Sequence, residues 1–164
     1  MNDSAQSILL TLAEISIAYV GFAAIVGALS TSVEEWSTDL RILFRSMIET
    51  GLMTVFICVV PGTVSLFSLP ETDLWMLSSA FASALIVFAM IARLVQVRKT
   101  IGTPLRVAKI VLIPVMTLSV LLMVVNSLLL REAGPYTLAV LLCLLLCTAQ
   151  FLAVTYRLFP LVRM

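Results

Sequence analysis

Five long apolar segments, separated by short polar loops, follow one another along this chain of 164 residues. At a rise of about 1.5 Å per residue, a helix of about 20 residues crosses a hydrocarbon core of about 30 Å. We therefore predict five membrane-crossing helices, at residues 8–29, 42–68, 74–95, 107–130 and 136–158. The sequence thus predicts an all-α integral membrane protein, a bundle of five transmembrane helices in which residues 1–164 form a single membrane domain. A four-helix alternative stays open, because Glu14 and the polar start of the second segment weaken two hydropathy signals.

The composition indicates that the bilayer is the solvent of this chain. Hydrophobic residues make up 62% and charged residues 12% of the sequence, which leaves too little polar surface for a water-soluble fold. The predicted helices use up most of the chain, so there is no room for a soluble catalytic or nucleic-acid-binding domain. The sequence has no histidine, and it shows neither a cluster of metal-binding side chains nor a glycine-rich phosphate loop. We therefore expect that the protein is not an enzyme, that it binds no metal or other cofactor, and that it has no nucleic-acid partner.

The basic residues are distributed unevenly between the two sides of the predicted bundle. Arg131 falls on one side, and the other nine of the ten fall on the opposite side: Arg41, Arg45, Arg93, Arg98, Lys99, Arg106, Lys109, Arg157 and Arg163. Cytoplasmic loops carry an excess of Lys and Arg. We therefore predict that the N-terminus lies outside and the C-terminus in the cytoplasm. Five of the basic side chains are expected to anchor helix ends by reaching to the membrane surface: Arg41, Arg93, Arg98, Arg106 and Lys109.

Glu14 is the most unusual residue of the first segment, because it lies about 9 Å inside the predicted membrane boundary. An ionised carboxylate is costly at that depth. Three small residues, Ala18, Gly21 and Ala28, share its side of the helix, which predicts that Glu14 faces a helix–helix contact. Asn126 of the fourth segment has a comparable depth and could donate a hydrogen bond to it. Two interpretations stay open, a structural polar clamp and an ion or proton site.

A second group of polar residues lies near the opposite boundary. Arg45 and Glu49 are one helical turn apart, which predicts an intrahelical ion pair. Gln150 of the fifth segment has a similar depth. These residues could form an inner polar constriction or a cation-binding carboxylate, or they could simply set the depth of the helix.

Small residues predict where helices pack closely. The first segment is rich in them, and Gly21, Ala24 and Gly27 belong to its small-residue pattern, so we expect these three to be helix-packing residues. The first three helices are expected to form the packed part of the bundle. Leu and Val dominate the fourth and fifth segments, which predicts extensive lipid exposure for these two helices.

Local signals also mark the second helix and the membrane interface. Ser37 or Thr38 can cap the second helix. Pro61 should kink that helix or free a backbone carbonyl, and in lipid a neighbouring helix must then satisfy it. Trp75 and Tyr136 are expected at the outer membrane interface, where such rings are enriched.

Residues 12–16 and 21–27, together with Arg45, Glu49 and the segment 66–70, resemble those of a group of small bacterial multi-span membrane proteins of uncharacterised function. The resemblance covers roughly the first 70 residues. It implies a multi-pass protein of the bacterial inner membrane. It implies no activity, so no functional residue is carried over.

Two functions are compatible with these features. The first is a non-enzymatic membrane protein that acts by helix association, either as a homo-oligomer or as a subunit of a larger membrane complex. The surplus of small-residue faces favours it. The alternative is an ion or proton channel or transporter that uses an intramembrane carboxylate, Glu14 and also Glu49.

Overall fold

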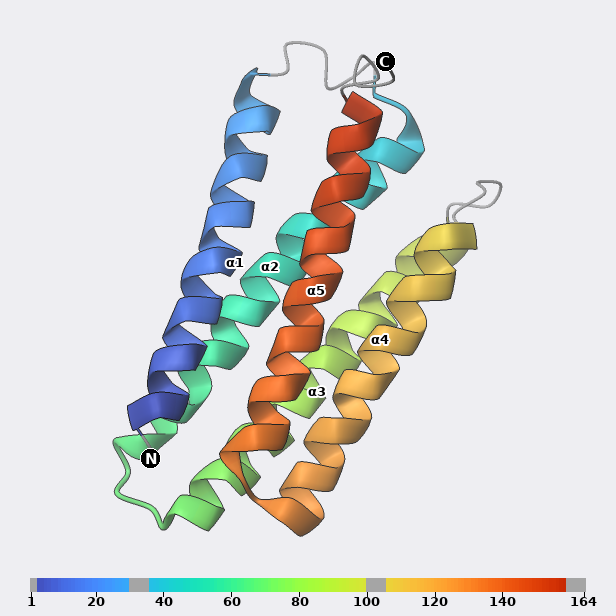
Figure 1. Cartoon of the computed structure of the whole chain (residues 1–164). Helices are drawn as coiled ribbons and strands as arrows, with labels where there is room; N and C mark the ends of the chain where they lie inside the picture. The colour runs from blue at the N-terminus through green and yellow to red at the C-terminus, as the bar shows by residue number, and fades with distance from the viewer. Residues whose placement is uncertain (1–2, 30–35, 100–105, 159–164) are drawn as a thin grey trace.

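The helices run alternately in opposite directions along one bundle (Figure 1). The computed structural model describes residues 3–29, 36–99 and 106–158. In this part of the chain the elements are α1 (Asp3–Leu29), α2 (Thr38–Ser65), α3 (Glu71–Lys99), α4 (Arg106–Val125), the short π-helix η2 (Asn126–Leu130) and α5 (Ala133–Leu158). Within it, five helical stretches are long and apolar enough to cross a membrane, with η2 completing the stretch that α4 begins. The prediction of an all-α fold with five such helices is confirmed.

The helix ends differ from the predicted segments because polar residues, which a hydropathy pattern leaves out, form the first turns. Helix α1 already begins at Asp3, and α3 begins at Glu71. Helix α2 ends at Ser65, three residues before the predicted boundary. The predicted cap of α2 is present, since the Ser37 hydroxyl accepts a hydrogen bond from the backbone N–H of Leu40 at 3.3 Å. The cap fixes where α2 begins.

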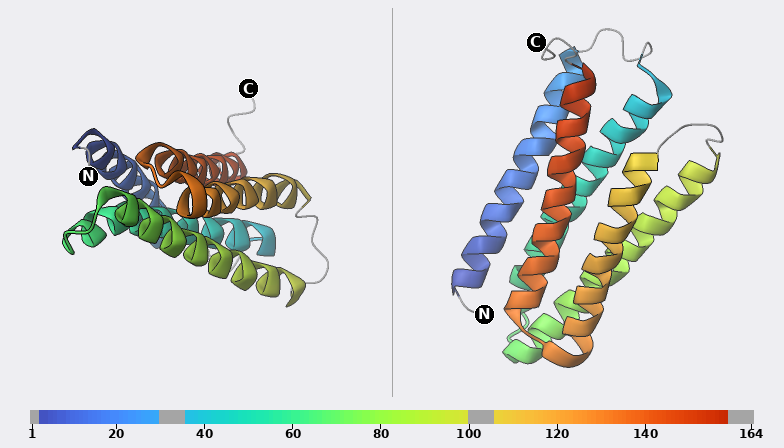
Figure 2. Two further views of the ribbon diagram at one scale, coloured as in Figure 1. Left: turned by 90° about the horizontal axis from the view of Figure 1, so that it is seen from below. Right: turned by 45° about the vertical axis from the view of Figure 1, so that its right-hand side comes forward.

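The bundle has two layers (Figures 1 and 2). Helices α1, α5 and α4 lie side by side in one layer, and α2 and α3 form the other. Helix α5 therefore contacts α1 and α4 within its layer and α2 across the layers. We call the end of the bundle where α1 begins the N-terminal end, and the end where α5 finishes the C-terminal end.

The central position of α5 contradicts the prediction that this helix is extensively lipid-exposed. Its buried residues recur at the spacing of one helix face: Tyr136, Ala139, Val140, Cys143, Cys147, Gln150 and Val154. Only its other face is exposed, with Leu138, Leu141 and Leu145. The Leu-rich composition gave no sign of this division, because a bilayer-facing leucine and a buried leucine are chemically identical. The packed core accordingly includes α5 as well as α1, α2 and α3, and α4 contributes Met116 and Met123 to it.

Pro61 is accommodated inside α2 as the sequence predicted. Proline has no N–H, so the carbonyl of Ile57, one turn earlier, lacks its usual helical partner. The hydroxyl of Tyr136 in α5 donates to this carbonyl at 2.6 Å. A neighbouring helix thus satisfies the freed backbone group, which is what an apolar environment requires.

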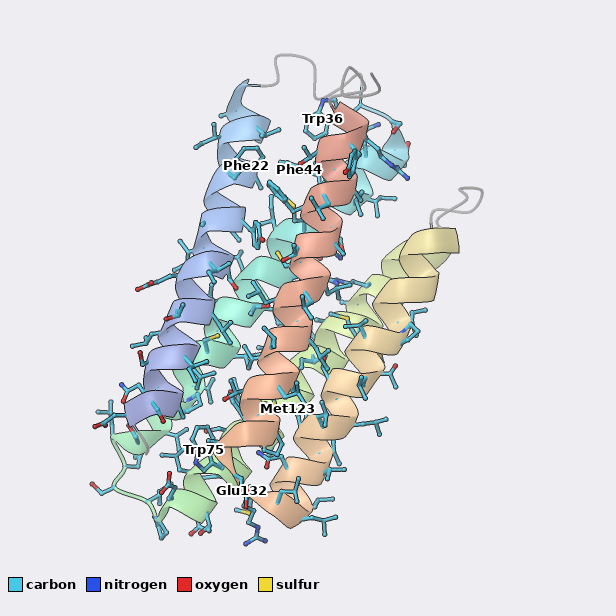
Figure 3. All side chains as sticks on the ribbon, viewed as in Figure 1. Phe22, Trp36, Phe44, Trp75, Met123 and Glu132 are labelled. Carbon is cyan, nitrogen blue, oxygen red and sulfur yellow. The ribbon has the colours of Figure 1, made fainter. Side chains whose placement is uncertain are left out.

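Trp75 and Tyr136 lie near the starts of α3 and α5, at the N-terminal end of the bundle, but they do not face the surroundings as interface residues would. Both are buried, and their ring centroids lie 5.5 Å apart. Figure 3 shows Trp75 and Met123 inside the N-terminal half of the bundle. The aromatic rings are used here to fill the core between α3 and α5.

Candidate functional site

Arg45 and Glu49 of α2 form the ion pair that their spacing predicted. The Nε of Arg45 donates to Oε1 of Glu49 at 2.7 Å. The Arg45 side chain is 68% exposed and that of Glu49 is 36% exposed, so the pair lies at the surface of the bundle. An exposed pair of this kind contributes only about 0–1 kcal/mol to stability.

Arg93 joins this pair from inside the bundle. It is only 8% exposed, and its Nη2 donates to the Thr50 hydroxyl at 2.8 Å and to the Ser46 carbonyl at 3.2 Å. Its Nε lies 3.7 Å from Oε2 of Glu49. The prediction that Arg93 reaches out to the membrane surface is therefore wrong. Its position continues the buried face of α3, which includes Ala82 and Ile86, so the side chain points at α2.

Gln150 of α5 reaches the same turn of α2 as the ion pair. Its Nε2 donates to the Ser46 hydroxyl at 3.0 Å, and the residue is 5% exposed. The structure thus brings together three of the predicted polar residues, Arg45, Glu49 and Gln150, near the C-terminal end of the bundle. Arg93 and Ser46 connect them.

We define the Arg93 cluster as the side chains of Ser46, Glu49, Thr50, Arg93 and Gln150. Counting Arg45 at its edge, it combines two guanidinium groups with one carboxylate, so the group carries an excess of one positive charge. Its N–H groups can donate hydrogen bonds to an oxygen acceptor. Its side chains also link α2, α3 and α5. Among the residues that the structure describes, no three His, Cys, Asp or Glu side chains come together as a metal site would need.

Asn126 serves as a clamp at the N-terminal end of the bundle. Its Nδ2 donates to the Ser79 hydroxyl at 2.8 Å and to the Glu132 carbonyl at 2.9 Å. Its Oδ1 accepts from the Glu132 backbone N–H at 3.0 Å. Glu132 lies in the turn that joins η2 to α5 (Figure 3). The side chain therefore fixes the reversal of the chain and ties it to α3. The predicted hydrogen bond from Asn126 to Glu14 is absent.

Glu14 lies on the outer side of α1. The buried face of this helix contains Leu9, Ala13, Ser16 and Ala23, whereas Glu14 is exposed. At about 100° per residue, Glu14 is almost opposite the middle of that buried face. The prediction that Glu14 faces a helix–helix contact is therefore wrong within this chain, and the helical pattern alone could not have said which side faces the bundle.

The small residues that share the side of Glu14 lie on the same outer surface. Ala18, Gly21 and Ala28 are all exposed. A Cβ placed on Gly21 would meet no atom within 4 Å. We define the α1 outer face as Glu14, Ala18, Gly21, Ile25 and Ala28. The sequence placed these residues correctly on one side of the helix.

The three predicted packing residues have different surroundings. Gly21 and Ala24 are exposed, so neither is buried against another helix in the described part of the chain. Gly27 is half-buried against the ring of Phe44, whose Cζ would lie 3.5 Å from an added Cβ. Among the described glycines, the tightest contact is instead at Gly51, where a Cβ would lie 2.6 Å from Cγ2 of Val20. Sequence analysis missed Gly51, although a lone glycine inside a long helix is a signal of close packing.

No protein family, curated protein or solved structure matches this chain.

Proposed function

We propose that this protein is a multi-pass protein of the bacterial inner membrane that acts, without catalysis, by pairing with a second copy of itself through the α1 outer face. Five apolar helices support the multi-pass character. For the orientation, we propose an outer N-terminus and a cytoplasmic C-terminus. Arg41, Arg45 and Arg157 lie towards the C-terminal end and Arg131 towards the other, which supports this orientation. The resemblance of the first 70 residues supports a bacterial inner membrane.

The observation that carries the proposal is the exposed carboxyl group of Glu14. Helix α1 has 27 residues, and Glu14 lies about 16 Å along its axis from Asp3, near the middle of the helix. In a bilayer this places a carboxyl group on the lipid-facing surface at a depth where an ionised side chain costs about 2.5 kcal/mol or more. A protein partner that covers Glu14 removes this cost.

A second copy supplies what the α1 outer face lacks. All copies insert in the same orientation, so two α1 helices pair in parallel and place equivalent residues at equal depth. A neutral carboxyl group both donates and accepts hydrogen bonds, so two Glu14 side chains can satisfy each other. Ala18, Gly21 and Ala28 follow Glu14 at successive spacings of four, three and seven residues. Small side chains at such spacings let two helix backbones approach closely.

The alternative of an ion or proton pathway through one chain has less support. Such a pathway runs between the helices, whereas Glu14 points away from them. Glu49, the other carboxylate of that hypothesis, is paired with Arg45.

Disulfide cross-linking in native membranes tests the pairing. The three native cysteines, Cys58, Cys143 and Cys147, are replaced by alanine, and Gly21→Cys is introduced. The matched control is Leu121→Cys, which also lies on an exposed helix face. With a mild oxidant, we expect a dimer of this chain for Gly21→Cys and monomer for Leu121→Cys.

Two outcomes contradict the proposal. Equal dimer yields for the two variants would mean random collision in the membrane. A cross-link from Gly21→Cys to a different membrane protein, without dimer, would mean that the α1 outer face binds another partner.

A further inference from the structure

The Arg93 cluster contains buried polar atoms that lack hydrogen-bond partners among the described residues. Two such atoms are the Nε of Arg93 and the Oε1 of Gln150. Among the described residues, the Nη1 of Arg93 has one hydrogen-bond partner, the sulfur of Met116 at 4.0 Å. Arg93 and Gln150 are each more than nine-tenths buried. The cluster therefore has N–H groups that need an oxygen acceptor and one amide oxygen that needs a donor.

We propose that the Arg93 cluster is a hydrated site that binds water inside the bundle. A small anion would satisfy the guanidinium N–H groups but would leave the Gln150 oxygen without a donor. A cation would be repelled by the excess positive charge of Arg45 and Arg93. Water both accepts from Arg93 and donates to Gln150, and buried water in proteins bridges groups of this kind.

The charged side chains at the cluster become more exposed towards its edge. Exposure of the side chain rises from 10% for Arg93 to 36% for Glu49 and 68% for Arg45. Arg45 is seven residues from the start of α2, about 10 Å along the axis, and its long side chain can reach the helix end. Water thus enters from the C-terminal end of the bundle, past the Arg45–Glu49 pair. This inference does not depend on the proposed pairing through α1.

Thiol accessibility tests the inference, because only the hydrated thiolate reacts with methanethiosulfonates. In a chain with the native cysteines replaced by alanine, Gln150→Cys is compared with Leu152→Cys. Residue 152 has a similar depth in α5 but is exposed on the outer side of the bundle. After reconstitution in lipid vesicles, a charged methanethiosulfonate should modify Gln150→Cys at least about tenfold faster than Leu152→Cys. Equal rates would overturn the inference.

A second measurement uses the wild-type chain, in which Gln150 is not replaced by cysteine. Infrared bands of guanidinium groups shift when their N–H protons exchange for deuterium, and a hydrated guanidinium exchanges quickly. The difference between wild type and Arg93→Met isolates Arg93 from the other arginines. We expect this band to shift within minutes in D2O. A band that stays protonated for hours in wild type and is missing in Arg93→Met would show a dry cluster and overturn the inference.

Discussion

The hydroxyl of Tyr136 donates to the carbonyl of Ile57, the one carbonyl of α2 that Pro61 deprives of its helical partner. The O···O distance is 2.6 Å, and Tyr136 is fully buried. The bond joins α5 to α2 where the backbone of α2 would otherwise be unsatisfied. One side chain thus makes a proline tolerable within an apolar helix bundle.

Removing this hydroxyl should destabilise the protein in a way that depends on Pro61. Tyr136→Phe leaves the Ile57 carbonyl buried and unpaired, which costs about 1–3 kcal/mol. Pro61→Ala restores an N–H that can bond to the same carbonyl. In the Pro61→Ala background, Tyr136→Phe should therefore cost at least about 1 kcal/mol less than it does alone. The free energy of unfolding of the four chains in mixed micelles measures this coupling. Additive effects would mean that the hydroxyl does not replace the missing helical bond.

The contact between Gly51 and Val20 predicts a strong effect of one added methyl group. A Cβ at residue 51 would lie 2.6 Å from Cγ2 of Val20, and a β-branched side chain has little freedom to move away. Gly51→Ala should lower the free energy of unfolding by about 1–3 kcal/mol. Gly62→Ala is the control in the same helix, because nothing lies within 4 Å of its added Cβ. It should be neutral or stabilising, and a loss equal to that of Gly51→Ala would contradict close packing at residue 51.

What could be predicted from the sequence was local. The Arg45–Glu49 pair and the Ser37 cap follow from spacings of four and three residues, respectively, along α2, and both are present. The free carbonyl near Pro61 was predictable for the same reason. Its partner Tyr136 was not, because no local pattern links α5 to α2.

The direction in which a helix face points could not be derived either. Glu14, Ala18 and Gly21 do lie on one side of α1, but that side is the outer one. Arg93 was expected at the surface and lies inside. In a chain with apolar residues on all sides of each helix, hydropathy does not distinguish the lipid-facing side from the buried side. Inter-helix contacts decide it.

Asn126 should be among the polar residues most important for stability. Its side chain makes hydrogen bonds to Ser79 and to both backbone groups of Glu132. Asn126→Leu removes all these hydrogen bonds at once and leaves the groups of Ser79 and Glu132 without Asn126 as a partner. We therefore expect the free energy of unfolding to fall by about 2–4 kcal/mol. Ser79→Ala removes one bond and should cost about 1 kcal/mol. Thermal unfolding of the two variants in the same detergent gives the comparison, and a smaller loss for Asn126→Leu than for Ser79→Ala would refute the clamp.

Glu49 has a buried partner, Arg93, and an exposed partner, Arg45. Losing the interaction with the buried partner should cost more stability than losing the interaction with the exposed one. Glu49→Gln takes the counter-charge from buried Arg93, so it should cost about 2 kcal/mol. Arg45→Met removes only the exposed partner and should cost less than about 1 kcal/mol. Combining Glu49→Gln with Arg93→Met should recover much of the loss, because no unpaired charge is left buried. Unfolding free energies measured in parallel test this order, and no recovery in the double variant would contradict an interaction between Glu49 and Arg93.

Substitutions of Glu14 should affect association and leave the fold of the single chain unchanged, since the side chain is exposed. Glu14→Gln keeps a group that donates and accepts, so dimerisation should stay close to that of wild type. Glu14→Leu removes the hydrogen bond between the two copies and should weaken dimerisation by about 1 kcal/mol, or about fivefold in the dissociation constant. Energy transfer between labelled copies, measured in vesicles over a range of protein-to-lipid ratios, gives that constant. Leu121→Ala serves as the control on an exposed face of α4 and should have no effect. If Glu14→Leu strengthened the dimer, the carboxyl groups would oppose pairing, and the proposed role of the α1 outer face would be wrong.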